Sequence, residues 1–391
     1  MKKEIYSTAQ QHERAIIVAL DIESSHTKNT WNVQDSLDEL ENLVKNAGGK
    51  VVGRLTQRLP QALKTTYLGK GKLQELIELK ETLLYDTVIF DDELSPLQQR
   101  VLESYLCVKV IDRVAVILDI FAKHAETREG RLQVELAQHE YLLPRLTGQW
   151  THLERLGAGI GTRGPGESQL ETDRRLLQRK IVALKSKLDE VSKQRELYRS
   201  RRRQQGVPIV ALVGYTNSGK SSLLKALTKA DVLVQDKLFA TLDPTTRRIS
   251  LQGNRHQALI TDTVGFINKL PPAIISAFHA TLEELKEASV IVHVIDINAH
   301  NASEQCQTVE SILTDLEISA KPRITVYNKI DLLPGVTHDW EEHKALSELS
   351  DIVKNRPDNT VLTSVVKRWG LVNLMSEIAG LISLLEQPEN S

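Results

Sequence analysis

The chain is most constrained by the segment 207–224, VPIVALVGYTNSGKSSLL, which reads as an apolar strand, a short loop and the start of a helix. Gly214 and Gly219 enclose four residues, and Lys220 and Ser221 follow directly. This is the G-x-x-x-x-G-K-S phosphate-binding pattern in the context that it requires. The backbone and the helix N-terminus present N–H groups to a phosphate, Lys220 adds positive charge, and the Ser221 hydroxyl can bind Mg²⁺. We therefore expect a nucleoside triphosphate and Mg²⁺ here, contacted by Gly214, Tyr215, Thr216, Asn217, Ser218, Gly219, Lys220, Ser221 and Ser222.

The length of the chain, 391 residues, allows two or three domains with a core each. Its formal net charge is −1, so a surface that binds nucleic acid has to be local. No apolar run reaches the roughly 18 residues that a membrane span needs. The first residues, MKKEIYSTAQQHERA, contain no apolar signal segment. These features predict a cytoplasmic protein without stable insertion into a membrane.

Residues 1–125 alternate strand-like and helix-like patterns, which predicts a small parallel α/β domain. Strands are expected at 15–22, 51–56, 87–90 and 108–111, and helices at 36–47, 72–84, 95–103 and 114–124. No catalytic group of residues stands out in this domain. Its segment YLGKGK, 67–72, is either a basic contact loop or a solvated turn.

Residues 126–206 are expected to form a helical hairpin. A first helix, 131–143, ends before Pro144, and the segment 157–167, GAGIGTRGPGE, is rich in glycine. That segment contains G-x-G-x-x-G, but a helix rather than a strand precedes it, so we interpret it as a connecting loop and not as a dinucleotide site. A long helix begins near residue 170, with apolar residues in steps of four and three that predict an antiparallel coiled coil. These residues are Leu177, Ile181, Leu184, Leu188 and Val191.

The long helix is also strongly basic. Between residues 171 and 203 the sequence holds twelve Lys or Arg and five Asp or Glu, which gives a local net charge of 12 − 5 = +7. Such a face is either a solvated side of the coiled coil or a contact with RNA phosphates.

Residues 207–391 return to strand–helix alternation and are expected to form the nucleotide-binding domain. A threonine in the loop 238–248 can supply a second Mg²⁺ ligand, and Thr241, Thr245 and Thr246 all qualify. Asp262 follows a strand at 257–260 and can hold Mg²⁺ through water, and the Gly265 N–H can contact the γ-phosphate. Their neighbours in the D-x-x-G motif are Thr263 and Val264.

A further strand, 323–327, runs into the sequence NKID. The Asp331 carboxylate can accept both N–H groups on the edge of guanine, the stem of Lys329 can cover the base, and Asn328 can tie this loop to the phosphate loop. The motif, completed by Ile330, predicts GTP rather than ATP as the ligand. A strand at 361–363 then leads to a loop whose backbone amides can reach guanine O6, at Ser364, Val365 and Val366.

The ordered motifs GYTNSGKSS, FATLDPTTR, DTVGF and NKID resemble those of the HflX family, in the Obg–HflX group of GTPases. The segments GPGESQLETDRR and QVELAQHEYLLPRL also look like hallmarks of that family, so the resemblance spans about residues 10–385. It implies that Thr241 binds Mg²⁺, and that it acts with Lys220 and Gly265 in catalysis. One departure is Ser364-Val365, where the family has an SA-type loop. The residues around Thr241 that the resemblance assigns to the nucleotide site are Phe239, Ala240, Leu242 and Asp243.

The resemblance also implies a biological role. It implies an α/β domain, a helical hairpin and a GTPase domain in that order, and GTP hydrolysis coupled to binding the large ribosomal subunit. Ribosome splitting or rescue under stress is the implied outcome. Two alternatives stay open: a GTPase switch in ribosome assembly or RNA modification, and an RNA-binding protein whose nucleotide site is regulatory.

Two residues bear on the rate of hydrolysis. Phe266 stands where many GTPases place a water-orienting glutamine, which predicts slow hydrolysis until a partner activates it. Asn217 occupies the position at which some related GTPases use an asparagine to help bind K⁺; the alternative is that it supports its own loop.

Overall fold

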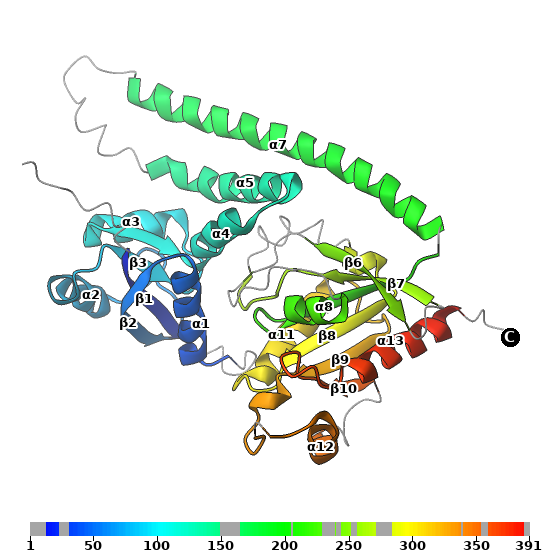
Figure 1. The fold of residues 1–391 in the computed structure, drawn as a ribbon. Coiled ribbons are helices and arrows are strands. Elements are labelled where there is room, and N and C mark those ends of the chain that lie inside the picture. The colour runs from blue at the N-terminus through cyan, green and yellow to red at the C-terminus, as the bar shows by residue number, and fades with distance from the viewer. Residues whose placement is uncertain are drawn as a thin grey trace, which may run out of the picture. The chain divides into compact units, whose positions relative to one another are not determined.

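The computed structural model describes residues 13–22, 31–148, 165–204, 206–228, 239, 244–251, 256–270, 284–337, 339–352 and 359–386. The chain divides into two compact units (Figure 1). Unit 1 comprises Met1–Ile120 and Pro144–Glu171, and unit 2 comprises Phe121–Leu143 and Thr172–Ser391.

Unit 1 is built on a four-stranded sheet in the order β2-β1-β3-β4, with every pair parallel. Its central strand is a continuous apolar run, buried from Ala15 to Leu20, as expected of a strand covered on both faces. The predicted parallel α/β domain is confirmed. Its strands are β1 (Arg14–Ile22), β2 (Lys50–Leu59), β3 (Thr87–Phe90) and β4 (Lys109–Asp112), and its helices are α1 (Val33–Asn46), α2 (Lys70–Leu83), α3 (Pro96–Leu106) and the start of α4 (Arg113–His124).

Side-chain caps set the helix starts in unit 1. The Asn32 side chain accepts a hydrogen bond from the Gln34 N–H at 3.1 Å, so α1 begins three residues before the predicted start at 36. Ser95 and Gln98 form a reciprocal capping box at α3.

Two helices connect the sheets, α5 (Arg128–Leu142) and α7 (Pro165–Gln204), with the 3₁₀ segment η2 (Leu143–Gly148) after α5. Lys185 of α7 pairs with Glu140 at 2.8 Å, and Arg195 pairs with Glu129 at 2.7 Å. Because the partners follow in opposite order along the two helices, α5 and α7 lie antiparallel. No helix in the described ranges is both long and apolar enough to cross a membrane.

The exposure of its side chains shows which side of α7 packs against the rest of the protein. Ile181 and Leu184 are buried, and Leu177, Leu188 and Val191 are less exposed than the residues that flank them. These are the positions that the four-three spacing picked out.

The sheet of unit 2 has the order β10-β9-β8-β5-β7-β6, parallel except for β6, which pairs antiparallel with β7 at one edge. Its strands are β5 (Ile209–Gly214), β6 (Thr245–Leu251), β7 (His256–Asp262), β8 (Val290–Asp296), β9 (Arg323–Asn328) and β10 (Thr360–Leu362). Its helices are α8 (Lys220–Thr228), α11 (Ala302–Asp315), α12 (Glu342–Glu348) and α13 (Leu371–Glu386), with 3₁₀ segments η3 (Ile330–Leu332) and η4 (Ser350–Ile352). The predicted GTPase-type fold with a mostly parallel sheet is confirmed.

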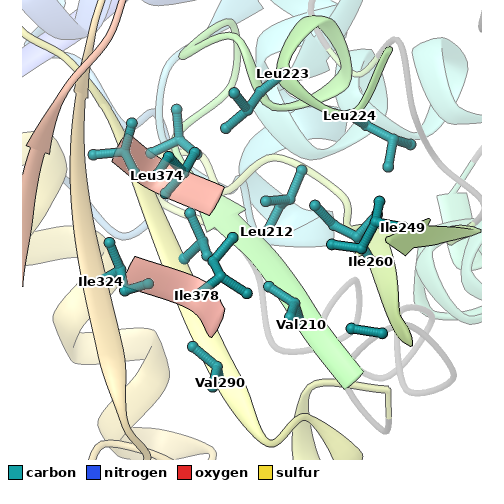
Figure 2. Close-up of a cluster of buried hydrophobic side chains, with 14 of the residues drawn as sticks. Val210, Leu212, Leu223, Leu224, Ile249, Ile260, Val290, Ile324, Leu374 and Ile378 are labelled. Carbon is teal, nitrogen blue, oxygen red and sulfur yellow. The ribbon is translucent and has the colours of Figure 1, made fainter. Parts of the chain in front are cut away.

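One face of this sheet packs against α8 and α13 (Figure 2). Val210 and Leu212 of β5 point to this face, together with Leu374 and Ile378, which are one helical turn apart on α13. The alternate residues of β8 point to the other face, where His293 lies 3.9 Å from Glu310 of α11. Covering both faces leaves only the ends of the strands for a ligand, as is general for open α/β sheets.

Candidate nucleotide-binding site

The phosphate loop lies between the end of β5 and the start of α8. Gly219 has φ +101°, and a Cβ there would lie 2.2 Å from the Asn328 side-chain nitrogen, so no larger residue fits. That nitrogen donates to the Ser218 carbonyl at 3.0 Å. The absence of a side chain at Gly219 therefore leaves room for Asn328, which links the NKID segment to the phosphate loop.

Lys220 is buried, with 5 % of its surface exposed. Its ammonium donates to the carbonyl oxygens of Gly214 at 3.1 Å and Tyr215 at 2.7 Å. Burial lowers the pKa of Lys220 from 10.5 to about 8, and the negative charge of Asp262 opposes this shift. Within the described part of the chain no carboxylate forms an ion pair with Lys220. The ammonium group is thus fixed in position, and its positive charge is available to an anionic ligand.

Ser221 and Asp262 come together where α8 begins and β7 ends. The Ser221 hydroxyl donates to a carboxylate oxygen of Asp262 at 2.6 Å, and Asp262 is buried. A hydroxyl and a carboxylate are the hard oxygen donors that Mg²⁺ prefers, so these residues fit the ion. The neighbouring Thr263 hydroxyl instead donates to the Leu212 carbonyl at 2.6 Å, so Thr263 supports the strands with its side chain.

The D-x-x-G segment lies directly on the phosphate loop. The Phe266 N–H donates to the Gly214 carbonyl at 3.1 Å, and the Thr216 N–H donates to the Phe266 carbonyl at 2.8 Å. A Cβ on Gly265 would lie 2.8 Å from the Thr216 Cα and 3.0 Å from the Lys220 nitrogen. Position 265 therefore admits only glycine, and its backbone lies beside the Lys220 ammonium.

The NKID residues form a bonded corner after β9. Asn328 also accepts a hydrogen bond from the Thr363 hydroxyl at 3.2 Å. Lys329 has a left-handed backbone, φ 65°, and its ammonium pairs with Asp296 at 2.7 Å. Ile330 is buried, and Asp331 follows in η3 with part of its surface accessible.

The loop after β10 lies against this corner. The Val365 N–H donates to the Asn328 side-chain oxygen at 3.4 Å, and the Ser364 hydroxyl accepts from the Lys367 N–H at 3.1 Å. Ser364 is buried and Val366 is 84 % exposed. The structure thus brings the three residues to the NKID corner, and directs the Val365 amide toward Asn328.

The loop before β6 is described only at Phe239. Ala240, Thr241, Leu242 and Asp243 lie outside the described residues. Phe239 has φ 57° and packs edge-to-face on Phe121 of α4, with ring centroids 4.7 Å apart. The two other candidate threonines, Thr245 and Thr246, belong to β6, and the Thr246 hydroxyl bonds the Thr261 hydroxyl at 2.9 Å.

Family models match three consecutive parts of the chain. Residues 34–122 match the N-terminal domain and residues 124–202 the middle region of a GTP-binding GTPase. Residues 209–329 match a domain described as a 50S ribosome-binding GTPase.

The GTPase HflX of Caldanaerobacter subterraneus subsp. tengcongensis is 52% identical over 325 residues, which is 83% of this chain and 74% of that protein. The GTPase HflX of Alkalihalophilus pseudofirmus is 50% identical over 298 residues, 76% of this chain and 70% of that protein. The chain belongs to the HflX family. A solved structure of SsGBP with GDP covers 96% of this chain and all of its own, at 26% identity and a TM-score of 0.47.

As a member of the HflX family, the chain is a GTPase that hydrolyses GTP to GDP and phosphate. The site also contains residues that no sequence motif singles out. Asp296 holds Lys329, and the Asn298 amide donates to the Lys329 carbonyl at 2.6 Å. Asp296 is the last residue of β8 and Asn298 lies two residues further on. Because β8 is the strand beside β5, strand order identifies both as candidates once the sheet is known.

Proposed function

We propose that this HflX-family GTPase binds GTP with Mg²⁺ at the site between β5, β7 and β9, and couples hydrolysis to action on the large ribosomal subunit. The main support for the nucleotide site is the hydrogen bond from the Asn328 side chain to the Ser218 carbonyl. This bond joins the motif expected to recognise guanine to the loop expected to bind phosphate. The ribosomal partner is supported by the match of residues 209–329 to a 50S ribosome-binding GTPase.

In this proposal the phosphate loop, from Gly214 to Ser222, cradles the phosphates with its N–H groups. Lys220 binds the β- and γ-phosphates, and the Gly265 N–H contacts the γ-phosphate. Ser221 and Thr241 would hold Mg²⁺, and Asp262, which accepts a hydrogen bond from the Ser221 hydroxyl, would hold it through water. When bound, Mg²⁺ neutralises charge that develops on the phosphates.

Guanine is selected by Asp331, whose carboxylate accepts two N–H groups of the base. The stem of Lys329 covers the ring, and the pair with Asp296 fixes that stem. The Val365 N–H donates to the Asn328 side chain, and the Ser364 hydroxyl accepts from the Lys367 N–H, so the loop after β10 is fixed beside the NKID corner. An adenine presents an acceptor to one side of Asp331, so ATP binds more weakly.

Slow hydrolysis without a partner is supported by Phe266. Its side chain is buried, and both its N–H and its carbonyl are bonded to the phosphate loop. This residue therefore offers no group to orient a water. Single-turnover hydrolysis with and without ribosomes tests the proposal: we expect faster hydrolysis with ribosomes, and equal rates would contradict it.

A requirement for K⁺ is supported by Asn217. The residue is exposed in the phosphate loop with φ 60°, and an amide oxygen is a group that can bind a cation. K⁺ beside the phosphates would neutralise charge as an arginine finger does. Turnover in K⁺ buffer should exceed turnover in Na⁺ buffer, and indistinguishable rates would rule out the K⁺ site.

For the biological role we propose splitting or rescue of stalled ribosomes in the cytoplasm under stress. Ribosomal RNA contacts are assigned to the basic helix, 171–203, and to the glycine-rich segment 157–167, most of which lies outside the described residues. Pelleting with ribosomes in a GTP analogue and in GDP tests this role. Binding to mature large subunits in the analogue is expected, whereas binding only to assembly precursors would favour the assembly switch.

A further inference from the structure

Tyr215 lies inside the phosphate loop, and its side chain is bonded to the segment that follows the D-x-x-G motif. It is 4 % exposed, and its hydroxyl accepts a hydrogen bond from the Asn268 N–H at 2.6 Å. Asn268 is itself buried, three residues beyond Gly265. The side chain of one loop residue thus reaches the backbone of the D-x-x-G segment.

This contact is the third in a short ladder. The first two are main-chain bonds, from Phe266 to Gly214 at 3.1 Å and from Thr216 to Phe266 at 2.8 Å. The Tyr215 hydroxyl extends the ladder by two residues, to Asn268. Among these three bonds, it is the one that a side-chain substitution can remove.

The ladder determines where Gly265 lies. The backbone of Gly265 is held so close to Thr216 and Lys220 that a Cβ would meet them at 2.8 and 3.0 Å. A shift of the following residues would carry Gly265 away from the phosphate end of the loop. Because no side chain can act at position 265, its N–H is useful only if the backbone is held in place.

We propose that Tyr215 is a positioning residue for GTP hydrolysis, whose hydroxyl holds the Gly265 N–H in line with the γ-phosphate. The inference rests on the proposed contact between Gly265 and the γ-phosphate. GDP has no γ-phosphate, so the effect of Tyr215 is confined to the triphosphate state. This separates Tyr215 from residues that bind both nucleotides.

The test is Tyr215→Phe in the full chain, which removes one oxygen and keeps the ring. The Asn268 N–H is then buried without its acceptor, so the segment shifts. Affinity for a non-hydrolysable GTP analogue should fall about tenfold and kcat by a similar factor, while GDP affinity stays within about twofold.

A matched control is Tyr85→Phe in unit 1. The Tyr85 hydroxyl is also buried and donates to the Leu76 carbonyl at 2.7 Å, so the same chemical change is made far along the sequence from the loop. Tyr85→Phe should lower thermal stability and leave the ratio of GTP-analogue to GDP affinity unchanged.

Equal losses of GTP-analogue and GDP affinity in Tyr215→Phe would show that Tyr215 supports the whole loop, and would overturn the proposal. So would unchanged affinities and kcat. The unaltered chain separates this failure from failure of the proposed function. If it binds the GTP analogue and hydrolyses GTP but Tyr215→Phe has no selective effect, only the role of Tyr215 is wrong; if it does neither, the proposed nucleotide site itself is wrong.

Discussion

The two sheets of the molecule treat a buried cation in opposite ways. In unit 1, Arg113 is 2 % exposed and pairs with Asp91 at 2.8 Å and with Glu39, and Arg145 pairs with Asp112 at 3.3 Å. In unit 2, Lys220 is also buried but is held by two carbonyl oxygens.

The difference shows that a parallel α/β sheet does not by itself make a binding site. Both sheets carry polar residues after their strands, where ligands of such folds bind. In unit 1 these charges neutralise one another, and the Tyr67 hydroxyl bonds Asp92 in the same region. In unit 2 the cation is oriented by dipoles that carry no net charge, so its attraction for a phosphate is preserved.

The largest effect is expected from Lys220→Met. A charge-assisted contact with phosphate is lost, so GDP affinity should fall by about 100-fold or more. Titration with a fluorescent GDP derivative measures it. A loss below about fivefold would mean that the buried ammonium serves the fold rather than the ligand.

Arg113→Met makes the corresponding change in unit 1. It leaves the buried Asp91 without this cation, which should destabilise the unit by about 3–5 kcal/mol. Hydrogen exchange at the amides of β1 and β3 reports it. GDP affinity should stay within about twofold, and a large loss of GDP binding would contradict the division of roles between the two cations.

The pKa of Lys220 predicts how nucleotide binding depends on pH. The free protein loses the Lys220 proton above about pH 8, whereas a bound phosphate retains it. Binding then takes up a proton, so GDP affinity should be level below pH 8 and fall by up to about tenfold per unit above it. Affinities at pH 7, 8 and 9 measure this, and an affinity that rises with pH would refute it.

The smallest effect is expected on α7, whose charges are partly satisfied within the chain. Lys185, Arg195 and Arg199 pair with acidic residues, Arg199 with Glu284 at 3.6 Å. Lys180 and Lys187 are exposed. Changing these two to Gln should weaken the salt dependence of ribosome binding. The negative slope of log affinity against log salt should become smaller in magnitude by about 1.5.

The matched control for α7 removes two exposed lysines elsewhere, Lys225 and Lys344, by the same change to Gln. It should leave the slope unaltered. The same slope in both double variants would mean that α7 presents a solvated face.

Much of the fold followed from the sequence because its signals are local. Alternation of apolar runs with helical spacing located both parallel sheets, and the steps of Ile181 and Leu184 located the buried side of α7. The predicted starts of α1 and α5 lie three residues late, because the caps Asn32 and Thr127 precede the apolar pattern.

What the sequence did not reveal depends on pairing between distant segments. The strand β6 begins TTRR, with only Ile249 and Leu251 buried, so its alternation is too short to separate it from a loop. Likewise, the choice of Asp296 as the partner of Lys329 requires β8 and β9 to be neighbours. The roles of individual site residues stay predictions that the experiments above decide.

The 40 residues of α7 form one continuous helix, about 60 Å long at 1.5 Å per residue. Near the C-terminal end of the helix, Arg199 is paired with Glu284, which belongs to the same unit. In a helix of this length, a tilt of about 10° at one end displaces the other end by about 10 Å. If α7 stays rigid, a tilt of this size near Arg199 moves the opposite end of the helix by about one helix diameter.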